Sequence, residues 1–159
     1  MPIDHLAASS TKIMKPDLLA GMATNFESKL DRVRVLIAED DFLIALQIQE
    51  ALLTAGLQVV GTATTAEEVL DLASQERPAL VIMDVRLAGR NDGVEAAREL
   101  FQRFNIRCVF ATANDDLHTR HRAEPYAPLG WLTKPYTMES LMVTIVDALV
   151  LLGLRSPRG

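Results

Sequence analysis

The sequence predicts an α/β protein in which helices cover both faces of a five-stranded parallel sheet. Short apolar runs alternate along the chain with segments of helical periodicity, as in successive βαβ units. The runs are apolar throughout, which is typical of strands that helices bury on both sides. Because crossover connections are right-handed, the expected sheet is doubly wound.

The strands are expected at 33–38, 57–62, 79–83, 106–111 and 129–133. The chain has 159 residues, of which 49% are hydrophobic and 23% charged, and this fits one globular domain with a buried core. We expect that domain to cover residues 32–153. An N-terminal extension, partly helical or flexible, is expected over 1–31, and a short tail over 154–159.

Capping residues indicate where the helices between these strands begin and end. The helix starts are expected at Asp41, at the capping box Thr65-Ala66-Glu67-Glu68, at Asp92 and at Thr137. Gly56 suits the left-handed conformation that closes the first helix, and the last helix should run to about Leu152. The helix before the fifth strand should be short, because a proline inside it would cost about 3 kcal/mol. Pro125 and Pro128 therefore predict that it ends near Ala123 or Glu124.

Polar residues that could bind a metal ion or take part in a reaction follow four of these strands. They are Glu39 and Asp40, Asp84, Thr112, and Lys134. Ligands of doubly wound sheets bind beyond the carboxyl ends of the strands, so these side chains should meet at one edge. Two carboxylates about 4 Å apart repel by roughly 4 kcal/mol at an effective dielectric of 20, so a cation should lie among them. Mg²⁺ suits such oxygen ligands, and Asp84 is the expected phosphoryl acceptor, assisted by Thr112 and Lys134.

Residues 33–152 resemble the receiver domains of response regulators in two-component signalling. The motifs that carry the resemblance are Glu39-Asp40-Asp41, Val81-Ile82-Met83-Asp84, Asp92-Gly93, Phe110-Ala111-Thr112-Ala113 and Gly130-Trp131-Leu132-Thr133-Lys134-Pro135-Tyr136. The resemblance implies a flavodoxin-like strand order 2-1-3-4-5, Mg²⁺ and a phospho-aspartate. It also implies a metal bond from the backbone carbonyl of Arg86, and a cis peptide bond before Pro135.

The chain departs from the family pattern near the site. The loop from Asp84 to Gly93 is one residue longer than the common pattern and lacks its usual proline. Trp131 stands where Tyr or Phe usually forms the switch aromatic. Ala113 leaves room for a phosphoryl group, while Arg86 and Asn114 should tune the lifetime of that group. Phe-Ala-Thr and the short fourth helix are similar to a subgroup of stand-alone receivers with a FAT motif, although the expected glycine is missing.

The predicted function is that of a single-domain response regulator. It would accept a phosphoryl group from a histidine kinase or histidine phosphotransfer protein and signal by phosphorylation-dependent protein contact, catalysing only its own phosphorylation and dephosphorylation. Few residues follow the last helix, so no output domain is expected. Two alternatives stay open: a receiver-like scaffold without phosphorylation, and a Mg²⁺-dependent aspartyl-nucleophile phosphatase. The phosphatase would need a second acid where Arg86 stands.

Charge and hydropathy limit the partners. The net charge of −5 argues against nucleic acid, and no apolar run reaches the roughly 20 residues of a membrane span. Without a signal peptide, the expected location is the cytoplasm. Met142, Val146 and Val150 form an apolar stripe on the last helix. We expect that stripe to bind a downstream protein, a second protomer in a homodimer, or the N-terminal segment around Leu19, Met22 and Phe26.

Overall fold

The computed structural model describes residues 33–113 and 117–156, and within them five parallel strands form one sheet in the order β2-β1-β3-β4-β5. The predicted fold class is therefore confirmed. The strands are β1 (Arg34–Ala38), β2 (Gln58–Ala63), β3 (Leu80–Asp84), β4 (Arg107–Thr112) and β5 (Gly130–Thr133). The helices are α2 (Phe42–Thr54), α3 (Ala66–Glu76), α4 (Gly93–Phe104), α5 (Leu117–Ala123), the 3₁₀ turn η1 (Glu124–Tyr126) and α6 (Met138–Leu151). The predicted N-terminal extension and Asn114 lie outside the described residues.

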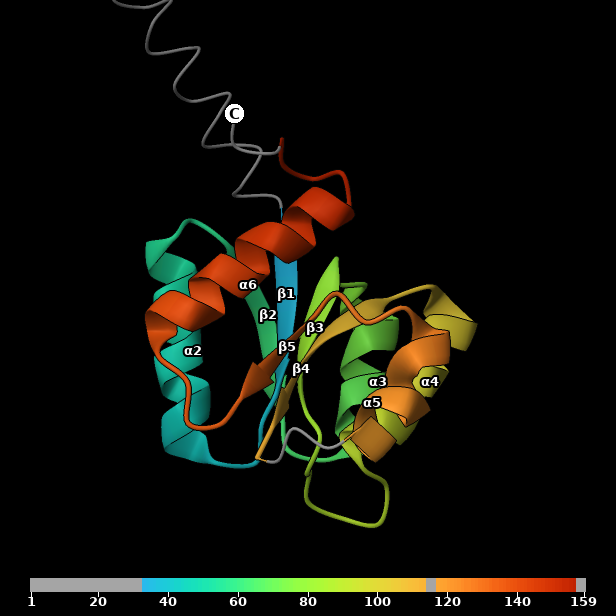
Figure 1. Ribbon diagram of the computed structural model, residues 1–159. Helices are drawn as coiled ribbons and strands as arrows, with labels where there is room; N and C mark the ends of the chain where they lie inside the picture. The colour runs from blue at the N-terminus through green and yellow to red at the C-terminus, as the bar shows by residue number, and fades with distance from the viewer. Residues whose placement is uncertain (1–32, 114–116, 157–159) are drawn as a thin grey trace, which may run out of the picture.

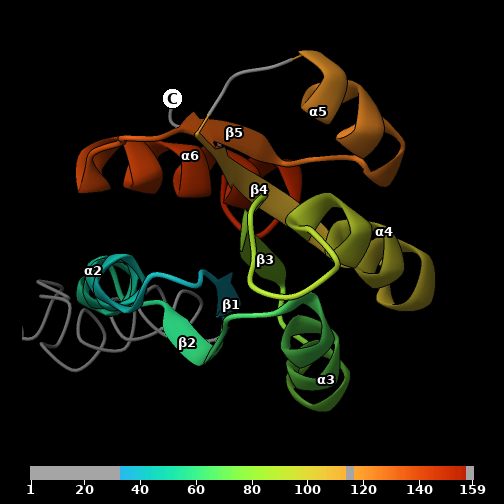
Figure 2. The same cartoon turned by 90° about the horizontal axis from the view of Figure 1, so that it is seen from below.

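The helices form two layers, one on each face of the sheet (Figure 1). Helices α2 and α6 cover one face, while α3, α4 and α5 lie on the other, as the view from below also shows (Figure 2). Every connection from one strand to the next passes through a helix, which brings the carboxyl ends of all strands to the same edge. None of the helices described here combines the length and the hydropathy that crossing a lipid bilayer requires.

Alternation along the strands divides the core into two clusters. In β1, Val35 and Ile37 pack beneath α2 and α6, while Leu36 and Ala38 face the other layer. Neighbouring residues of a strand point to opposite faces of the sheet, so an uninterrupted apolar run fills both clusters. All five residues of the middle strand β3 are buried, including Asp84 at its carboxyl end.

Side-chain caps begin the helices where the sequence predicts them. The side chains of Asp41, Thr65, Asp92 and Thr137 each accept a hydrogen bond from the first-turn N–H groups of α2, α3, α4 and α6. Helix α5 ends at Ala123, as the two prolines predict, and Pro125 is accommodated in the 3₁₀ turn that follows. Gly56 has the expected positive φ of 86° after α2.

The turn from β3 into α4 requires a residue without a side chain. The Gly93 N–H donates to the carbonyl of Val85 at 2.7 Å. A Cβ atom at Gly93 would lie 2.0 Å from the backbone oxygen of Asp84, far inside van der Waals contact. Gly93 therefore holds the start of α4 directly against the end of β3.

We predict that Gly93→Ala lowers the free energy of unfolding by roughly 3 kcal/mol or more, because backbone at the contact cannot move aside. Urea titration followed by circular dichroism measures this change. Gly61→Ala is the matched control, since its Cβ would meet only side-chain ends, those of Leu72 at 3.2 Å and Leu36 at 3.6 Å. Equal, small losses in both variants would show that the junction is not tightly packed.

Candidate functional site

Three carboxylates gather at the carboxyl edge of the sheet. Glu39 and Asp40 directly follow β1, and Asp84 ends the adjacent strand β3, which pairs with β1 up to Ala38 and Met83. One ligand oxygen from each of the three carboxylates lies within 4.8 Å of the others. Glu39 and Asp84 are buried, with 3% and 5% of their surface exposed, whereas Asp40 is exposed.

Lys134 reaches this group from the opposite end of the sheet edge. It follows β5, and its backbone N–H donates to the carbonyl of Thr112 at 2.8 Å. Its Nζ donates to Asp84 Oδ2 at 2.8 Å and to Glu39 Oε2 at 3.1 Å. Burial lowers the pKa of Lys134, but hydrogen bonds and charge from Asp84 and Glu39 outweigh it, so the pKa is raised and the ammonium form is secured.

The pKa of Glu39 reflects first its burial and then the carboxylate beside it. Burial and the nearby charge of Asp84 raise the pKa of Glu39 to about 7, despite opposing effects from the N–H of Asp41 and the ammonium of Lys134. The Asp41 N–H donates to Glu39 Oε1 at 3.1 Å. With three carboxylates and one ammonium, the cluster retains an excess of negative charge.

A divalent cation fits this arrangement chemically. The donors are all oxygens from carboxylates, and exposed Asp40 leaves a side of the cluster open to water. Mg²⁺ commonly uses one or two carboxylates and completes its shell with water. Glu39, Asp40 and Asp84 are therefore the residues that could hold Mg²⁺, and its charge would relieve the repulsion that raises the pKa of Glu39.

Thr112, the hydroxyl residue of the Phe-Ala-Thr motif, lies on the strand beside Asp84. Thr112 ends β4 and is buried, and β4 pairs with β3 so that Ala111 lies opposite Asp84. Ala113 follows at an exposed position. Thr112 and Lys134 thus belong to adjacent strand ends on the side of Asp84 away from Glu39.

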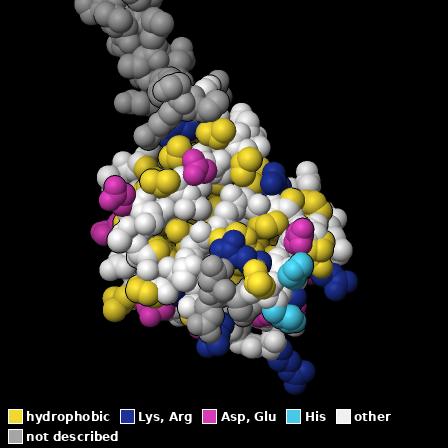
Figure 3. Space-filling model, viewed as in Figure 1, with side chains coloured by type: hydrophobic (Ala, Val, Ile, Leu, Met, Phe, Trp, Pro, Cys, Tyr) yellow, Lys and Arg dark blue, Asp and Glu magenta, His cyan; other side chains and the backbone are white. Residues whose placement is uncertain are grey.

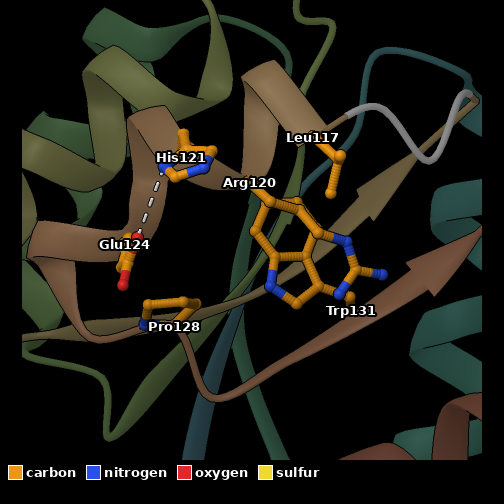
Figure 4. A pocket seen from close by; sticks show the side chains of 6 residues that line it. All are labelled: Leu117, Arg120, His121, Glu124, Pro128 and Trp131. Atoms are coloured by element: carbon orange, nitrogen blue, oxygen red, sulfur yellow. Dashed lines mark ion pairs between the residues drawn. The ribbon is translucent and has the colours of Figure 1, made fainter.

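Trp131 is held by two neighbours. Its indole stacks on Phe110 with ring centroids 4.7 Å apart and an interplanar angle of 19°. The guanidinium of Arg120 on α5 lies 5.0 Å from the ring centroid, and Figure 4 shows the two side chains over one another. The indole therefore lies between α5 and Phe110 of the neighbouring strand β4.

The remaining predicted site residues are placed as follows. Arg86 is exposed, and its backbone N–H donates to Asp84 Oδ1 at 3.0 Å. The Lys134–Pro135 peptide bond is cis. On α6, Met142, Val146 and Val150 are all half-buried, and Met142 also packs against the core and lines the groove beside α2. Val143 and Leu151 are the most exposed apolar residues of this helix, at 57% and 61%.

Two features near the site were not predicted from the sequence. The Tyr136 hydroxyl is buried beside the charged cluster, and burial together with the charge of Glu39 raises its pKa to about 12. Arg122 forms an ion pair with Asp92 at 2.8 Å. The position of Tyr136 directly after Lys134-Pro135 is a sequence signal for the buried hydroxyl. Nothing in the irregular segment around Arg122 indicates its ion pair with Asp92.

Comparison with known proteins identifies the class. Residues 35–146 match the response regulator receiver domain. The transcriptional regulatory protein PdtaR of Mycobacterium tuberculosis is 35% identical over 127 residues, which cover 80% of this chain and 61% of that protein. The phyllosphere-induced regulator PhyR of Methylorubrum extorquens is 31% identical over 135 residues, which cover 84% of this chain and 46% of that protein.

A solved structure agrees with the sequence relatives. The signal receiver domain of a modulated diguanylate cyclase from Desulfovibrio desulfuricans G20 is 34% identical, with a TM-score of 0.69, and the match covers 76% of this chain and 96% of that domain. The chain belongs to the response regulator receiver family. Its similarity spans only part of the length of PdtaR and PhyR.

The raised pKa of Glu39 predicts a pH dependence of stability. Without divalent cations, the folded protein binds more protons than the unfolded chain between about pH 4.5 and pH 7. The free energy of unfolding should therefore be greatest below this window and fall as the pH rises through it. Thermal or urea unfolding at several pH values measures the slope.

Two comparisons check this prediction. Glu39→Gln should flatten the slope because the titrating group is gone, and Mg²⁺ should reduce it in the unaltered protein. A slope in the opposite sense, or one that Glu39→Gln leaves unchanged, would contradict the assignment.

The Tyr136 hydroxyl generates a second prediction. Among the described residues it is the one buried side-chain polar atom without a hydrogen-bond partner. A buried hydroxyl left unpaired costs about 1 kcal/mol or more, so Tyr136→Phe should raise the free energy of unfolding by about 1 kcal/mol. Tyr126→Phe, at the other tyrosine of the chain, should give no comparable gain. A loss of stability in Tyr136→Phe would mean that the hydroxyl has a partner.

Proposed function

We propose that the protein is a phosphorylation-controlled signalling protein whose phosphoryl acceptor is Asp84. The donor would be a histidine kinase or a histidine phosphotransfer protein, and the signal would pass on by contact with a downstream protein. The observation that carries the proposal is the buried Asp84 carboxylate with the Lys134 ammonium 2.8 Å away and two further carboxylates beside it.

Each residue of the cluster has a proposed role. Glu39, Asp40 and Asp84, with the backbone carbonyl of Arg86, would hold Mg²⁺. When bound, Mg²⁺ supplies positive charge that lets an anionic phosphoryl group approach an acidic site. The carboxylate of Asp84 attacks phosphorus, the bond to the donor nitrogen breaks, and an acyl phosphate results. Lys134 and the Thr112 hydroxyl would then bind the phosphoryl oxygens, as charge-assisted hydrogen bonds favour.

The resting contacts explain how phosphorylation could act as a switch. Lys134 forms ion pairs with both Asp84 and Glu39. A phosphoryl group on Asp84 adds negative charge that attracts Lys134 and Thr112. Movement of Thr112 at the end of β4 would act on Thr133, its partner in β5, and along that strand on Trp131 beside α5. Ala113 directly follows Thr112 and Pro135 directly follows Lys134, and we propose that they tune this path together with Asn114, which lies outside the described residues.

The surface over α5 and α6 offers places for a partner. In Figure 3, histidine and basic side chains gather over α5, while apolar side chains are spread over α6. Leu117, Val143 and Leu151 are exposed at 76%, 57% and 61%. We propose that a downstream protein or a second protomer binds here, with Val146 and Val150 at its partly buried margin.

The alternatives receive less support. In an aspartyl phosphatase, a second acid would protonate the leaving group, but exposed Arg86 stands at that position. A scaffold without phosphorylation would not need an ammonium held against a buried aspartate, an arrangement that costs desolvation of both charges.

The decisive experiment is incubation of the protein with acetyl phosphate and Mg²⁺, followed by intact mass spectrometry. We expect one added phosphoryl group that hydroxylamine removes, as it removes acyl phosphates. Asp84→Asn should abolish the addition, whereas Asp71→Asn, at an exposed aspartate of α3, should leave it unchanged.

Other outcomes would select the alternatives. Repeated turnover of simple phosphate esters would support a phosphatase. No addition to the unaltered protein, with either acetyl phosphate or a phosphorylated kinase, would support the scaffold.

Asp40→Asn should raise the Mg²⁺ concentration needed for half-maximal phosphorylation by about tenfold, the expected size for removal of one charged contact.

A further inference from the structure

The loop between β3 and α4 carries Arg86 and is anchored on both sides. Towards α3, the Ala88 N–H donates to the carbonyl of Thr64 at 3.0 Å, and Asn91 donates to Glu67 at 3.2 Å. At its end, Asp92 makes the link to α5. The loop therefore spans the space between two helices, and a change at either anchor can alter its position.

Asp92 uses its two carboxylate oxygens for different tasks. Oδ1 accepts from the Glu95 N–H at 2.9 Å and caps α4. Oδ2 accepts from Arg122 Nη1 at 2.8 Å. Burial raises the pKa of Asp92, but the hydrogen bond to Arg122 and the cap outweigh it, so the pKa is lowered. The Asp92 carboxylate is therefore charged at neutral pH, and its link to Arg122 is an ion pair there.

Arg122 and Arg120 make two connections from one short helix. Arg122 reaches the end of the loop that follows Asp84, while Arg120 lies over Trp131 of β5. Figure 4 shows the second of these connections, with Leu117 and Pro128 nearby. Helix α5 has seven residues, too few to be stable by itself in water. Its position therefore depends on contacts with the rest of the protein, which include these two and the packing of Thr119 and Ala123.

We propose that Arg122 is a positioning residue for the cation site. Through Asp92 it ties α5 to the loop that carries Arg86, so that cation binding and the position of α5 influence one another. This route is separate from the one through Thr112 and Trp131. The inference rests on the proposed function, because it assigns the loop to the metal site of the phosphorylation reaction.

Thermodynamic linkage between cation binding and the position of α5 means that Mg²⁺ affinity reports on the Asp92–Arg122 ion pair. If the ion pair favours the loop position that binds the cation, its loss must weaken cation binding, and cation binding must strengthen the attachment of α5. Both side chains are about one third exposed, at 33% and 31%, so the pair contributes modestly. We expect the Kd for Mg²⁺ to rise about threefold when the pair is broken.

The test is a double-mutant cycle in the full chain with Mg²⁺ alone as the probe. Asp92→Asn keeps a residue that caps helices well but removes the charge. Arg122→Gln removes the charge of the partner, and the third variant carries both changes. The Mg²⁺ titration is followed by calorimetry and by the fluorescence of Trp131, which is the one tryptophan of the chain.

We expect each single variant to raise the Kd for Mg²⁺ about threefold and to diminish the fluorescence change, and the double variant to do no more than either. Arg122→Lys should recover most of the affinity. Arg103→Gln, at an exposed arginine of α4, is the control and should match the unaltered protein. Urea unfolding of each variant, measured in parallel, separates a change in Mg²⁺ affinity from a change in stability.

Additive effects of the two substitutions, or unchanged Mg²⁺ binding in the single variants, would overturn the inference. Phosphorylation by acetyl phosphate distinguishes this failure from failure of the proposed function. If the unaltered protein is phosphorylated but the cycle shows no coupling, the inference alone fails. If the cycle shows coupling but Asp84 accepts no phosphoryl group, the proposed function fails while the link between Arg122 and the cation site stands.

Discussion

The ammonium of Lys134 makes it possible to bury Asp84 and Glu39 side by side. Its contacts of 2.8 and 3.1 Å join three chain segments that are 50 and 95 residues apart in sequence. The fold depends on this compensation, since two charged carboxylates at the end of the central strands would otherwise repel one another in a dry environment. Burial and the charge of Asp84 still raise the pKa of Glu39 to about 7, and three carboxylates face one ammonium. The resting site is therefore prepared for further positive charge.

The position of this charged cluster beside helix α5 suits a protein that switches between conformations. The residues that hold the cluster lie at the ends of rigid strands, whereas α5 is short and depends on arginine contacts with Trp131 and Asp92. A site at strand ends beside a short helix suits a switch that works by small energies, because a modest change at the site can alter the population of helix positions.

The sequence was sufficient to predict the fold and the elements that carry the cluster. Parallel strands must bring their carboxyl ends to one edge, so the polar residue after each apolar run could be placed without coordinates. Strand boundaries were displaced by one residue because pairing with neighbours decides them. Asp84, for example, is the last residue of β3 and pairs with Ala111. Pairs such as Asp92–Arg122 and Arg120–Trp131 could not be predicted, since they depend on the course of an irregular segment. The direction of Met142 towards α2 likewise depends on how the two helices pack, which periodicity alone does not determine.

The most direct measurement is a crystal structure of the protein with Mg²⁺ and beryllium fluoride, a mimic of the phosphoryl group. We expect Mg²⁺ among the oxygens of Glu39, Asp40 and Asp84, with the fluoride group on Asp84 and in contact with Lys134 and Thr112. Mg²⁺ bound elsewhere, or Lys134 turned away from the group on Asp84, would contradict this expectation.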